Sequence, residues 1–398
     1  MSELSYLEKL LDGVEVEWLP LSKVFNLRNG YTPSKTKKEF WANGDIPWFR
    51  MDDIRENGRI LGNSLQKISS CAVKGGKLFP ENSILISTSA TIGEHALITV
   101  PHLANQRFTC LALKESYADC FDIKFLFYYC FSLAEWCQKN TTMSSFASVD
   151  MDGFKKFLIP RPCPNNPEKS LAIQSEIVRI LDKFSALTAE LTAELTAELT
   201  MRKKQYNYYR DQLLNLEGRE NTREMRIGDI YDFQYGTGNT IPKSGGQYPV
   251  YGSNGIVGSH DKYNSEDSPI IGHIGAYAGI VNWGQGKHFV TYNGVICRHK
   301  SKEVLQKYAY YLLLLQDFGS KSNSASQPFV SYNILNAPIV LVPPLQEQAR
   351  IVAILDKFDT LTNSITEGLP REIELRQKQY EYYRDLLFNF PKPETVSN

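Results

Sequence analysis

The side chains that most often perform catalysis are dispersed along this chain of 398 residues. Six histidines and seven cysteines show no ligand spacing and no C-x-x-C pair, so we expect neither a zinc site nor a disulfide framework. The phosphate-loop pattern G-x-x-x-x-G-K-[ST], the methyltransferase tetrapeptide N-P-P-[YF] and the metalloprotease motif H-E-x-x-H are absent from the sequence. MDD at 51–53 comes nearest to a nuclease carboxylate cluster, and we expect a polar turn there. The sequence therefore predicts no enzyme.

The composition is that of a folded protein without an excess of either charge. Apolar residues make up 42% and charged residues 22%, and 44 basic residues balance 44 acidic ones. Because phosphate neutralisation drives DNA affinity, this balance argues against a chain that binds DNA tightly by itself. It does not argue against a subunit that shares the duplex with basic partners. We recognise neither a secretion leader nor an apolar run of bilayer length, and expect a cytoplasmic protein.

The clearest pattern is an internal duplication. QSEIVRILDKF at 174–184 recurs as QARIVAILDKF at 348–358, and RKKQYNYYRDQLL at 202–214 recurs as RQKQYEYYRDLLF at 376–388, both at the same offset along the chain. Apolar residues recur every three or four positions, which predicts a long helix in each copy. Since such helices need a partner for their apolar stripes, we expect the copies to pack as an antiparallel pair. Gly368 and Pro370 should break the second copy into two pieces.

Three consecutive TAEL tetrapeptides lie inside the first copy, at 188–191, 192–195 and 196–199. Four residues advance by about 40° beyond a full turn of a helix, so the leucines form a slowly winding stripe. The array can therefore gain or lose a unit without changing which residue types face a partner. We interpret it as a helical spacer of adjustable length.

Two segments of different sequence, 18–163 and 218–344, alternate with the helices. Short apolar and aromatic runs between Gly, Asn and Ser predict strands and turns in both, with helices near 121–139 and 303–317. SILISTSATIG at 83–93 resembles PIIGHIGAYAG at 269–279, and Asn105 falls close to Asn293. We therefore expect two α+β domains on one scaffold. The expected order is an N-terminal segment 1–17, domain 18–163, central helix 164–217, domain 218–344, and distal helix with tail 345–398.

With these features the whole chain resembles the specificity subunits of type I restriction–modification systems. The resemblance rests on the duplicated helical blocks and on GYTPSKTKKEFWANGDIPW at 30–48. The TAEL array resembles that of the type IC subgroup. The implied fold is α+β: two globular target recognition domains separated by two long shared helices, packed as an antiparallel coiled-coil-like pair, with an internal pseudo-two-fold repeat.

The resemblance also implies a function and partners. Each recognition domain would read one half of an asymmetric, two-part site in double-stranded DNA. The helical pair would fix the gap between the halves, and three TAEL units suggest the longer of the usual gaps. Two modification (methyltransferase) subunits carrying S-adenosylmethionine would dock on the helices. Restriction subunits using ATP and Mg²⁺ would complete the endonuclease, while this chain would be non-catalytic and hold no cofactor or metal.

Such a function needs polar side chains on loops, because these read base edges while lysines bind phosphates. In the first domain we select Thr32, Ser34, Lys35, Lys37, Lys38, Arg50, Thr91, Asn105, Gln106 and Arg107. In the second domain we select Lys243, Ser253, Asn254, His273, Tyr277, Asn293, Ser331 and Tyr332. Any one of them could equally be a solvated loop residue. We expect Trp41 and Trp48 in the core rather than against bases.

The helices carry a second set of candidates, for the helical pair and for partner subunits. These are Leu181, Phe184, Leu187, Leu191, Leu195, Leu199, Tyr206, Tyr209, Arg210, Leu355, Phe358, Leu361, Tyr380, Tyr383 and Arg384. Because the tyrosine motif occurs twice, the part of it that does not pack the pair could present equal surfaces to two identical partners.

At one place the chain departs from the family. The family often has Arg-x-Gly where this chain has Thr88-Ser89-Ala90, and His273-Ile274-Gly275 stands at about the same place in the second domain. No arginine contact is carried over to either tripeptide.

Two competing hypotheses stay open. A structural adaptor whose two domains bind proteins would use the same helices, but loops rich in Asn, Ser and Lys favour groove recognition over an apolar protein interface. An autonomous nuclease or methyltransferase would need the motifs that the sequence lacks.

Overall fold

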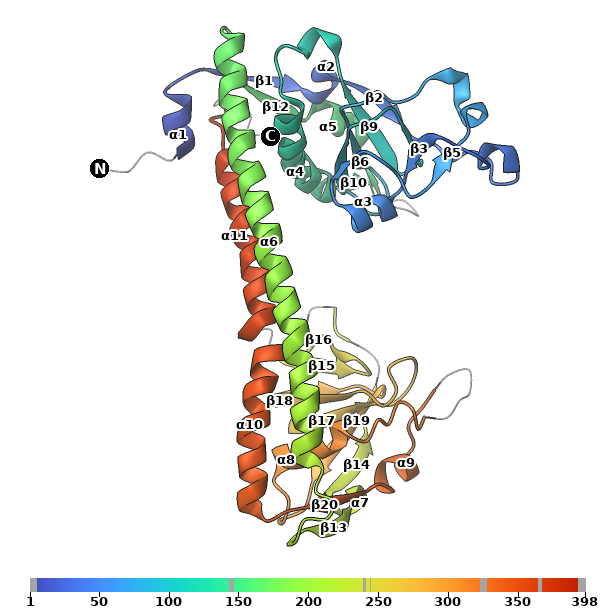
Figure 1. The fold of residues 1–398 in the computed structure, drawn as a ribbon, viewed down its shortest axis with the longest axis vertical. Helices are drawn as coiled ribbons and strands as arrows, with labels where there is room; N and C mark the ends of the chain where they lie inside the picture. The colour runs from blue at the N-terminus through green and yellow to red at the C-terminus, as the bar shows by residue number, and fades with distance from the viewer. Residues whose placement is uncertain are drawn as a thin grey trace. The chain divides into compact units, whose positions relative to one another are not determined.

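A computed structural model describes residues 6–142, 147–238, 241–243, 245–322, 328–363 and 367–392. The chain divides into two compact units, which we call the first unit (residues 1–192 and 375–398) and the second unit (residues 193–374) (Figure 1). Both are mixtures of helix and sheet, and the long helix α6 (Pro167–Leu214) contributes to each. The expected two-domain α+β architecture with a long central helix is confirmed. Among the described residues, no helix is long and apolar enough to cross a membrane.

The first unit is built on a five-stranded sheet. In order across the sheet its strands are β2 (Phe25–Asn29), β9 (Phe108–Leu113), β6 (Ser83–Ser87), β7 (His95–Ile98) and β4 (Ile60–Leu61). Smaller sheets join β5 (Lys67–Ile68), β3 (Ile46–Phe49) and β8 (Leu103–Ala104), then β1 (Val16–Pro20) with β12 (Leu158–Pro162), and β10 (Thr141–Thr142) with β11 (Ser148–Val149). Its shorter helices are α1 (Tyr6–Leu11), α2 (Leu21–Val24), α3 (Met51–Asn57), α4 (Ile123–Lys139) and α5 (Met151–Lys156).

The apolar run SILIS forms β6 because both faces of this sheet are covered. Ile84 and Ile86 pack into one core together with Phe125 of α4, whereas Leu85 packs into the opposite core with Trp48. Each of these side chains is at most 3% exposed. Successive side chains of a strand point to opposite faces, so a strand that is buried at every position belongs in the middle of a covered sheet.

The second unit repeats this plan with a six-stranded sheet. Its order is β14 (Tyr231–Tyr235), β19 (Gly294–His299), β17 (Ser265–Gly272), β18 (Val281–Val290), β15 (Tyr248–Gly252) and β16 (Gly255–His260). The remaining elements are β13 (Arg223–Arg226) paired with β20 (Ile339–Val342), α7 (Ile227–Ile230), α8 (Gln306–Leu314), α9 (Tyr332–Asn336) and α10 (Leu345–Asn363). The first four strands of the order match β2, β9, β6 and β7, which supports one scaffold used twice.

The second helical copy is broken, as the sequence predicts. It forms α10 and α11 (Gly368–Leu387), with residues 364–366 outside the described residues. Gly368 has φ 79°, and a Cβ there would lie 2.5 Å from the carbonyl oxygen of Thr360, so only glycine fits this turn. Pro370 lies in the first turn of α11, where no intrahelical N–H donor is needed.

The two helical copies pair through the same residues in both units. In the first unit α11 lies beside α6, and Phe184 stacks on Tyr383 with ring centroids 5.6 Å apart (Figure 1). In the second unit Phe358 of α10 stacks on Tyr209 of α6, with centroids 5.7 Å apart. Within the duplicated blocks, Phe358 is the counterpart of Phe184, and Tyr383 is the counterpart of Tyr209. Equivalent motif residues therefore form both contacts.

The other helix candidates range from buried to exposed. Leu181 and Leu355 are fully buried, and Arg384 is 6% exposed with its guanidinium 4.4 Å from the ring centroid of Phe131. Leu187, in contrast, is 51% exposed. The partly buried candidates are Leu191, Leu195, Leu199, Arg210, Leu361 and Tyr380, whereas Tyr206 is buried.

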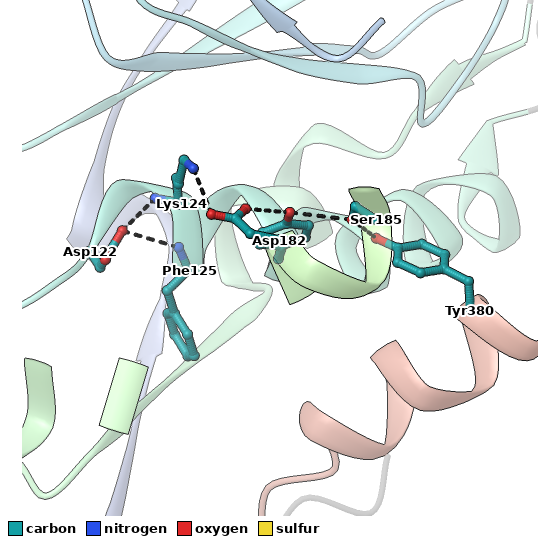
Figure 2. A network of polar contacts seen from close by, with 7 residues as sticks. Asp122, Lys124, Phe125, Asp182, Ser185 and Tyr380 are labelled. Carbon is teal, nitrogen blue, oxygen red and sulfur yellow. Dashed lines mark hydrogen bonds and ion pairs between the residues drawn. The ribbon is translucent and has the colours of Figure 1, made fainter. Parts of the chain in front are cut away.

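A polar network joins α4, α6 and α11 in the first unit (Figure 2). Asp182 of α6 accepts hydrogen bonds from the Tyr128 hydroxyl and from Lys124 Nζ, each over 2.7 Å. One turn further along α6, Ser185 Oγ donates to the Tyr380 hydroxyl of α11 over 3.0 Å. Burial raises the pKa of Tyr128, so its hydroxyl stays protonated and remains a donor.

The second unit repeats the contact between domain and helix. The Tyr311 hydroxyl of α8 donates to Asp356, which is the counterpart of Asp182 in the second copy of the duplicated block. Gln174 and Gln348, the first residues of the two block copies, form a second matched pair. Each is fully buried, and its Oε1 accepts the backbone N–H of the residue that caps α4 or α8. The duplicated blocks thus anchor each domain to its helix in the same way.

Two buried histidines are expected to lower the stability of the first unit in acid. Burial is the main cause that lowers the pKa of His95 to about 3 and that of His102 to about 4. The folded state keeps both neutral, whereas the unfolded chain binds protons below a pKa of about 6.5. The contribution of the two histidines to the free energy of unfolding should therefore be fully present above pH ~6.5. It should decline as the pH falls towards their folded-state pKa values. Chemical unfolding of the chain, followed by intrinsic tryptophan fluorescence between pH 7.5 and 5, measures this decline. The substitution His95→Gln should make the free energy of unfolding depend less on pH.

Candidate nucleic-acid interface

Three turns meet on the side of the first-unit sheet where strands β2 and β6 end and β9 begins, and we call this side the edge. They are residues 30–32 after β2, residues 88–93 after β6 and residues 105–107 before β9. Gly30 N–H donates to the carbonyl of Phe108 over 2.8 Å, and Thr88 N–H donates to the carbonyl of Arg107 over 2.9 Å. These backbone bonds place the selected Thr32, Thr91 and 105–107 side chains on one edge.

The second unit forms the same edge with the same backbone bonds. Gly236 N–H donates to the carbonyl of Gly294 over 2.9 Å, and His273 N–H donates to the carbonyl of Asn293 over 2.8 Å. A Cβ on Gly236 would lie 2.1 Å from the Thr291 carbonyl oxygen, and a Cβ on Gly30 would lie at that distance from the Asn105 carbonyl oxygen. Glycine is therefore required at both positions, where two turns approach each other.

The backbone bonds also decide which residues correspond. Thr88 and His273 occupy one position, since each carbonyl accepts the N–H of the equivalent residue Val149 or Val330. Ala90 and Gly275 follow with φ 64° and 88°. The predicted correspondence of 88–90 with 273–275 is confirmed.

The correspondence of Asn105 with Asn293 that the sequence suggests is displaced by two residues. Asn293 occupies the position of Arg107, and Asn105 that of Thr291. Asn105 and Asn293 share a residue type, but the backbone hydrogen bonds place them two positions apart. Gln106 consequently corresponds to Tyr292, which was not selected from the sequence although it stands beside Asn293.

A basic hollow of about 530 Å³ lies in the first unit. Lys35, Lys38 and Arg50 line it, with Trp41 and Trp48 among its walls. The tryptophan rings meet edge to face with centroids 5.1 Å apart, and their indole N–H groups donate to backbone carbonyls of the 31–34 segment over 3.0 Å. Trp48 is core, as expected, while Trp41 is partly exposed. The indoles thus fix the loop that carries the two lysines.

The remaining first-unit candidates are held by local contacts. Thr32 Oγ1 donates to Gln106 Oε1, and Asn105 Oδ1 accepts the N–H of Arg107. Ser34 and Lys37 are exposed on the 32–38 loop. Thr91 Oγ1 is buried and has no hydrogen-bond partner within the described part of the chain.

In the second unit several candidates have packing roles. His273 is 5% exposed, and its ring centroid lies 4.2 Å from that of Tyr235. Tyr332 stacks on the same Tyr235 and accepts its N–H over 2.9 Å. Ser331 caps α9. The exposed aromatic groups at this edge are instead Tyr277 and Tyr292, which are 48% and 47% exposed.

The hairpin between β15 and β16 brings Ser253 and Asn254 to this edge. Thr291 N–H donates to the carbonyl of Tyr251, as Asn105 N–H does to that of Phe49. Gly252 therefore occupies the position of Arg50, and the two-residue turn follows it directly. Asn254 is exposed, as is Lys243 in the described piece 241–243.

The MDD cluster at 51–53 contains one carboxylate with a structural role. MDD begins α3 rather than forming a turn, and Asp53 is fully buried. Its carboxylate accepts the N–H groups of Arg50 and Leu65, each over 2.6 Å, and so caps the helix. Both oxygens of the Asp53 carboxylate are therefore engaged in backbone hydrogen bonds. Among the described residues no group of three His, Cys, Asp or Glu could hold a metal.

Comparison with known proteins identifies the family. The family model for the type I restriction modification DNA specificity domain matches residues 13–201 and 219–375. The chain belongs to the type I specificity subunits. This family supplies the DNA-recognition component of type I restriction–modification systems, and the subunit accordingly works in a complex with other subunits and DNA.

Individual specificity subunits are similar in sequence over nearly all of this chain or the whole of it. The EcoprrI specificity subunit of Escherichia coli is 68% identical over 375 residues, covering 92% of this subunit and 93% of the relative. The EcoR124I/EcoR124II specificity subunit of Escherichia coli is 38% identical over 448 positions, covering 100% of both chains. A solved structure concerned with complex assembly of the type I R-M system has a TM-score of 0.61 at 16% identity, covering 94% of this subunit and 97% of that chain. At that identity the likeness concerns the fold alone.

Proposed function

We propose that each unit reads one half of a bipartite, asymmetric site in double-stranded DNA. The observation that carries this proposal is the shared edge. Identical backbone bonds hold three turns in both units, while the side chains on those turns differ: Gln106 and Arg107 in one, Tyr292 and Asn293 in the other. A constant frame with different polar and aromatic groups suits two readers of different base sequences.

The helices set the gap between the half-sites in this proposal. All three TAEL units lie within α6, which is helical without interruption from Pro167 to Leu214. A uniform helix transmits a change of length directly. Because α6 carries the TAEL array, we assign the subunit to the type IC subgroup, in which the number of TAEL units would tune the gap.

Two methyltransferase subunits dock on the helices and carry the chemistry. Tyr208 and Tyr382 are each 61% exposed and occupy the same position in the two copies of the tyrosine motif, so the helices offer one exposed aromatic group twice. Exposed aromatic side chains at matched positions suit two identical partners. S-adenosylmethionine, ATP and Mg²⁺ would belong to the methyltransferase and restriction subunits of a cytoplasmic complex.

A binding assay separates this function from a protein adaptor. The full subunit with its methyltransferase partner should bind DNA containing its methylation site far more tightly than random DNA of equal length. Specific sites are typically favoured by a factor of about 10³ or more. Equal binding to both DNAs would contradict sequence recognition and favour the adaptor.

The basic hollow should contribute affinity without sequence preference. Lys35→Ala with Lys38→Ala is expected to weaken binding to specific and random DNA alike, and to reduce the salt slope by roughly 1 to 2 if both lysines meet phosphates. Binding titrations from 50 to 200 mM salt measure the slope.

Lys23→Ala is the matched control for the lysine pair. Lys23 is exposed in α2, just before the start of β2. The edge formed by the turns 30–32, 88–93 and 105–107, which we call the reading edge, lies beyond the end of that strand. Its removal should leave the slope unchanged. If the double lysine substitution left the salt slope unchanged, the lysines of the hollow would not contact the phosphate backbone of the DNA.

A further inference from the structure

We propose that Gln106 reads an adenine in the half-site bound by the first unit, and that Thr32 orients its amide for this contact. The inference rests on the proposed function, because it assumes that this unit reads a half-site. It goes further by assigning one side chain to one base.

Gln106 stands on a turn that is fixed on both sides. Gly30 N–H donates to the carbonyl of Phe108, and Tyr31 N–H donates to the carbonyl of Ala104, each over 2.8 Å. These bonds clamp the 105–107 turn against the start of the 30–32 turn. Gln106 itself is exposed. An exposed polar side chain on a clamped turn is available to a ligand while its Cα is held in place.

The Thr32 hydroxyl selects one orientation of the Gln106 amide. Thr32 Oγ1 donates to Gln106 Oε1, so the oxygen lies towards Thr32 and Nε2 lies away from it. Within the described part of the chain, no other hydrogen bond engages this side chain. One lone pair of Oε1 and both protons of Nε2 are therefore left for a partner.

Those free groups match adenine. In the major groove adenine presents the N7 acceptor beside the N6 amino donor, and a glutamine amide can bind both at once. Gln106 Nε2 would donate to N7 while Oε1 accepts from N6. Because Thr32 has already fixed the amide, less side-chain entropy is lost on binding than for a free glutamine.

The second unit lacks both members of the pair. Tyr292 takes the position of Gln106, and Gly238 that of Thr32, as Tyr31 N–H bonds to Ala104 where Thr237 N–H bonds to Val290. The Tyr292 ring packs edge-on against His273, with centroids 5.2 Å apart. A phenol carries no paired donor and acceptor of this geometry. The adenine contact is therefore specific to the first unit.

The test uses the full subunit in complex with its methyltransferase partner and DNA carrying both half-sites. Each adenine of the first half-site is replaced in turn by 7-deazaadenine, which lacks N7. With the wild-type chain, one replacement should weaken binding by about 5- to 100-fold. With Gln106→Ala, binding to the natural site is already weakened and that replacement has no further effect.

Two further variants complete the design. Thr32→Val keeps the size of the side chain but removes the hydroxyl, and should reduce the effect of the same adenine replacement without moving it to another base. Tyr292→Ala should leave the 7-deazaadenine profile of the first half-site unchanged. Unaltered discrimination at the second half-site shows that the Gln106→Ala and Thr32→Val proteins are folded.

Two results would overturn the inference. In the first, Gln106→Ala retains the full 7-deazaadenine profile. In the second, the variant weakens binding to site and random DNA by the same factor, so that Gln106 contributes no base discrimination. If the wild-type complex itself fails to distinguish site from random DNA, the proposed function falls, and this inference falls with it.

Discussion

Exchange of residues 218–344 for the matching segment of another specificity subunit is expected to replace one half-site completely and to leave the other unchanged. All three turns of the second reading edge lie inside this segment, at 236–238, 273–279 and 291–293. The first edge lies wholly outside it. Adenine-methylation mapping in cells that carry the exchanged subunit with its partner measures both half-sites together.

The exchange must preserve the anchors that hold the domain to its helix. Gln348 and Asp356 remain in the recipient, while their partners, the Leu305 N–H and the Tyr311 hydroxyl, arrive with the new segment. A donor segment with tyrosine at the latter position should dock normally. Tyr311→Phe in the unexchanged chain is the matched control, and should cost stability, by about 1–3 kcal/mol, without altering either half-site. Loss of both half-sites after exchange would mean that the units do not read independently.

Deletion of residues 192–195 is expected to shorten the gap between the half-sites by one or two base pairs. The deletion removes one TAEL unit, which corresponds to about 6 Å of helix and a rotation of about 40° beyond one full turn. One base pair contributes about 3.4 Å and roughly 34–36° to the duplex. The rotations agree closely, whereas the translation is nearer to two base pairs. Methylation mapping of the deletion variant gives the new gap directly.

Glu194→Gln controls for a change in the TAEL array that keeps its length. The TAEL tetrapeptide at 192–195 then loses a charge but no residue, so the length of the gap and both half-sites should stay unchanged. A deletion variant with altered half-sites would contradict the spacer role of α6, because a shorter helix should leave the bases read by each unit unchanged.

The helices were predictable because their signals are local and repeated. Apolar residues at helical spacing and two copies at a constant offset predict both the rods and their pairing, and Gly368 marks the break. The structure adds the phenylalanine–tyrosine stacks of 184 with 383 and 358 with 209, which join equivalent residues of the two copies. The apolar run at 83–87 likewise predicts a strand, and the structure adds that this strand is buried on both faces.

The reading edge was predictable only in part because it depends on contacts between distant residues. His273 is a polar loop residue in the sequence, but it is 5% exposed in the fold, and the rings of Tyr235 and Tyr292 pack against it. The hydrogen bond between Thr32 and Gln106 joins two turns that are far apart in the sequence. The two-residue shift at Asn293 could not be seen without the backbone register.

The most direct test of two independent readers at a set distance is a genome-wide adenine-methylation map of cells expressing this subunit with its methyltransferase partner. The account predicts one asymmetric motif, with two different short half-sites and a gap of fixed length whose bases are unrestricted. A continuous motif, two identical half-sites or a gap of variable length would contradict it.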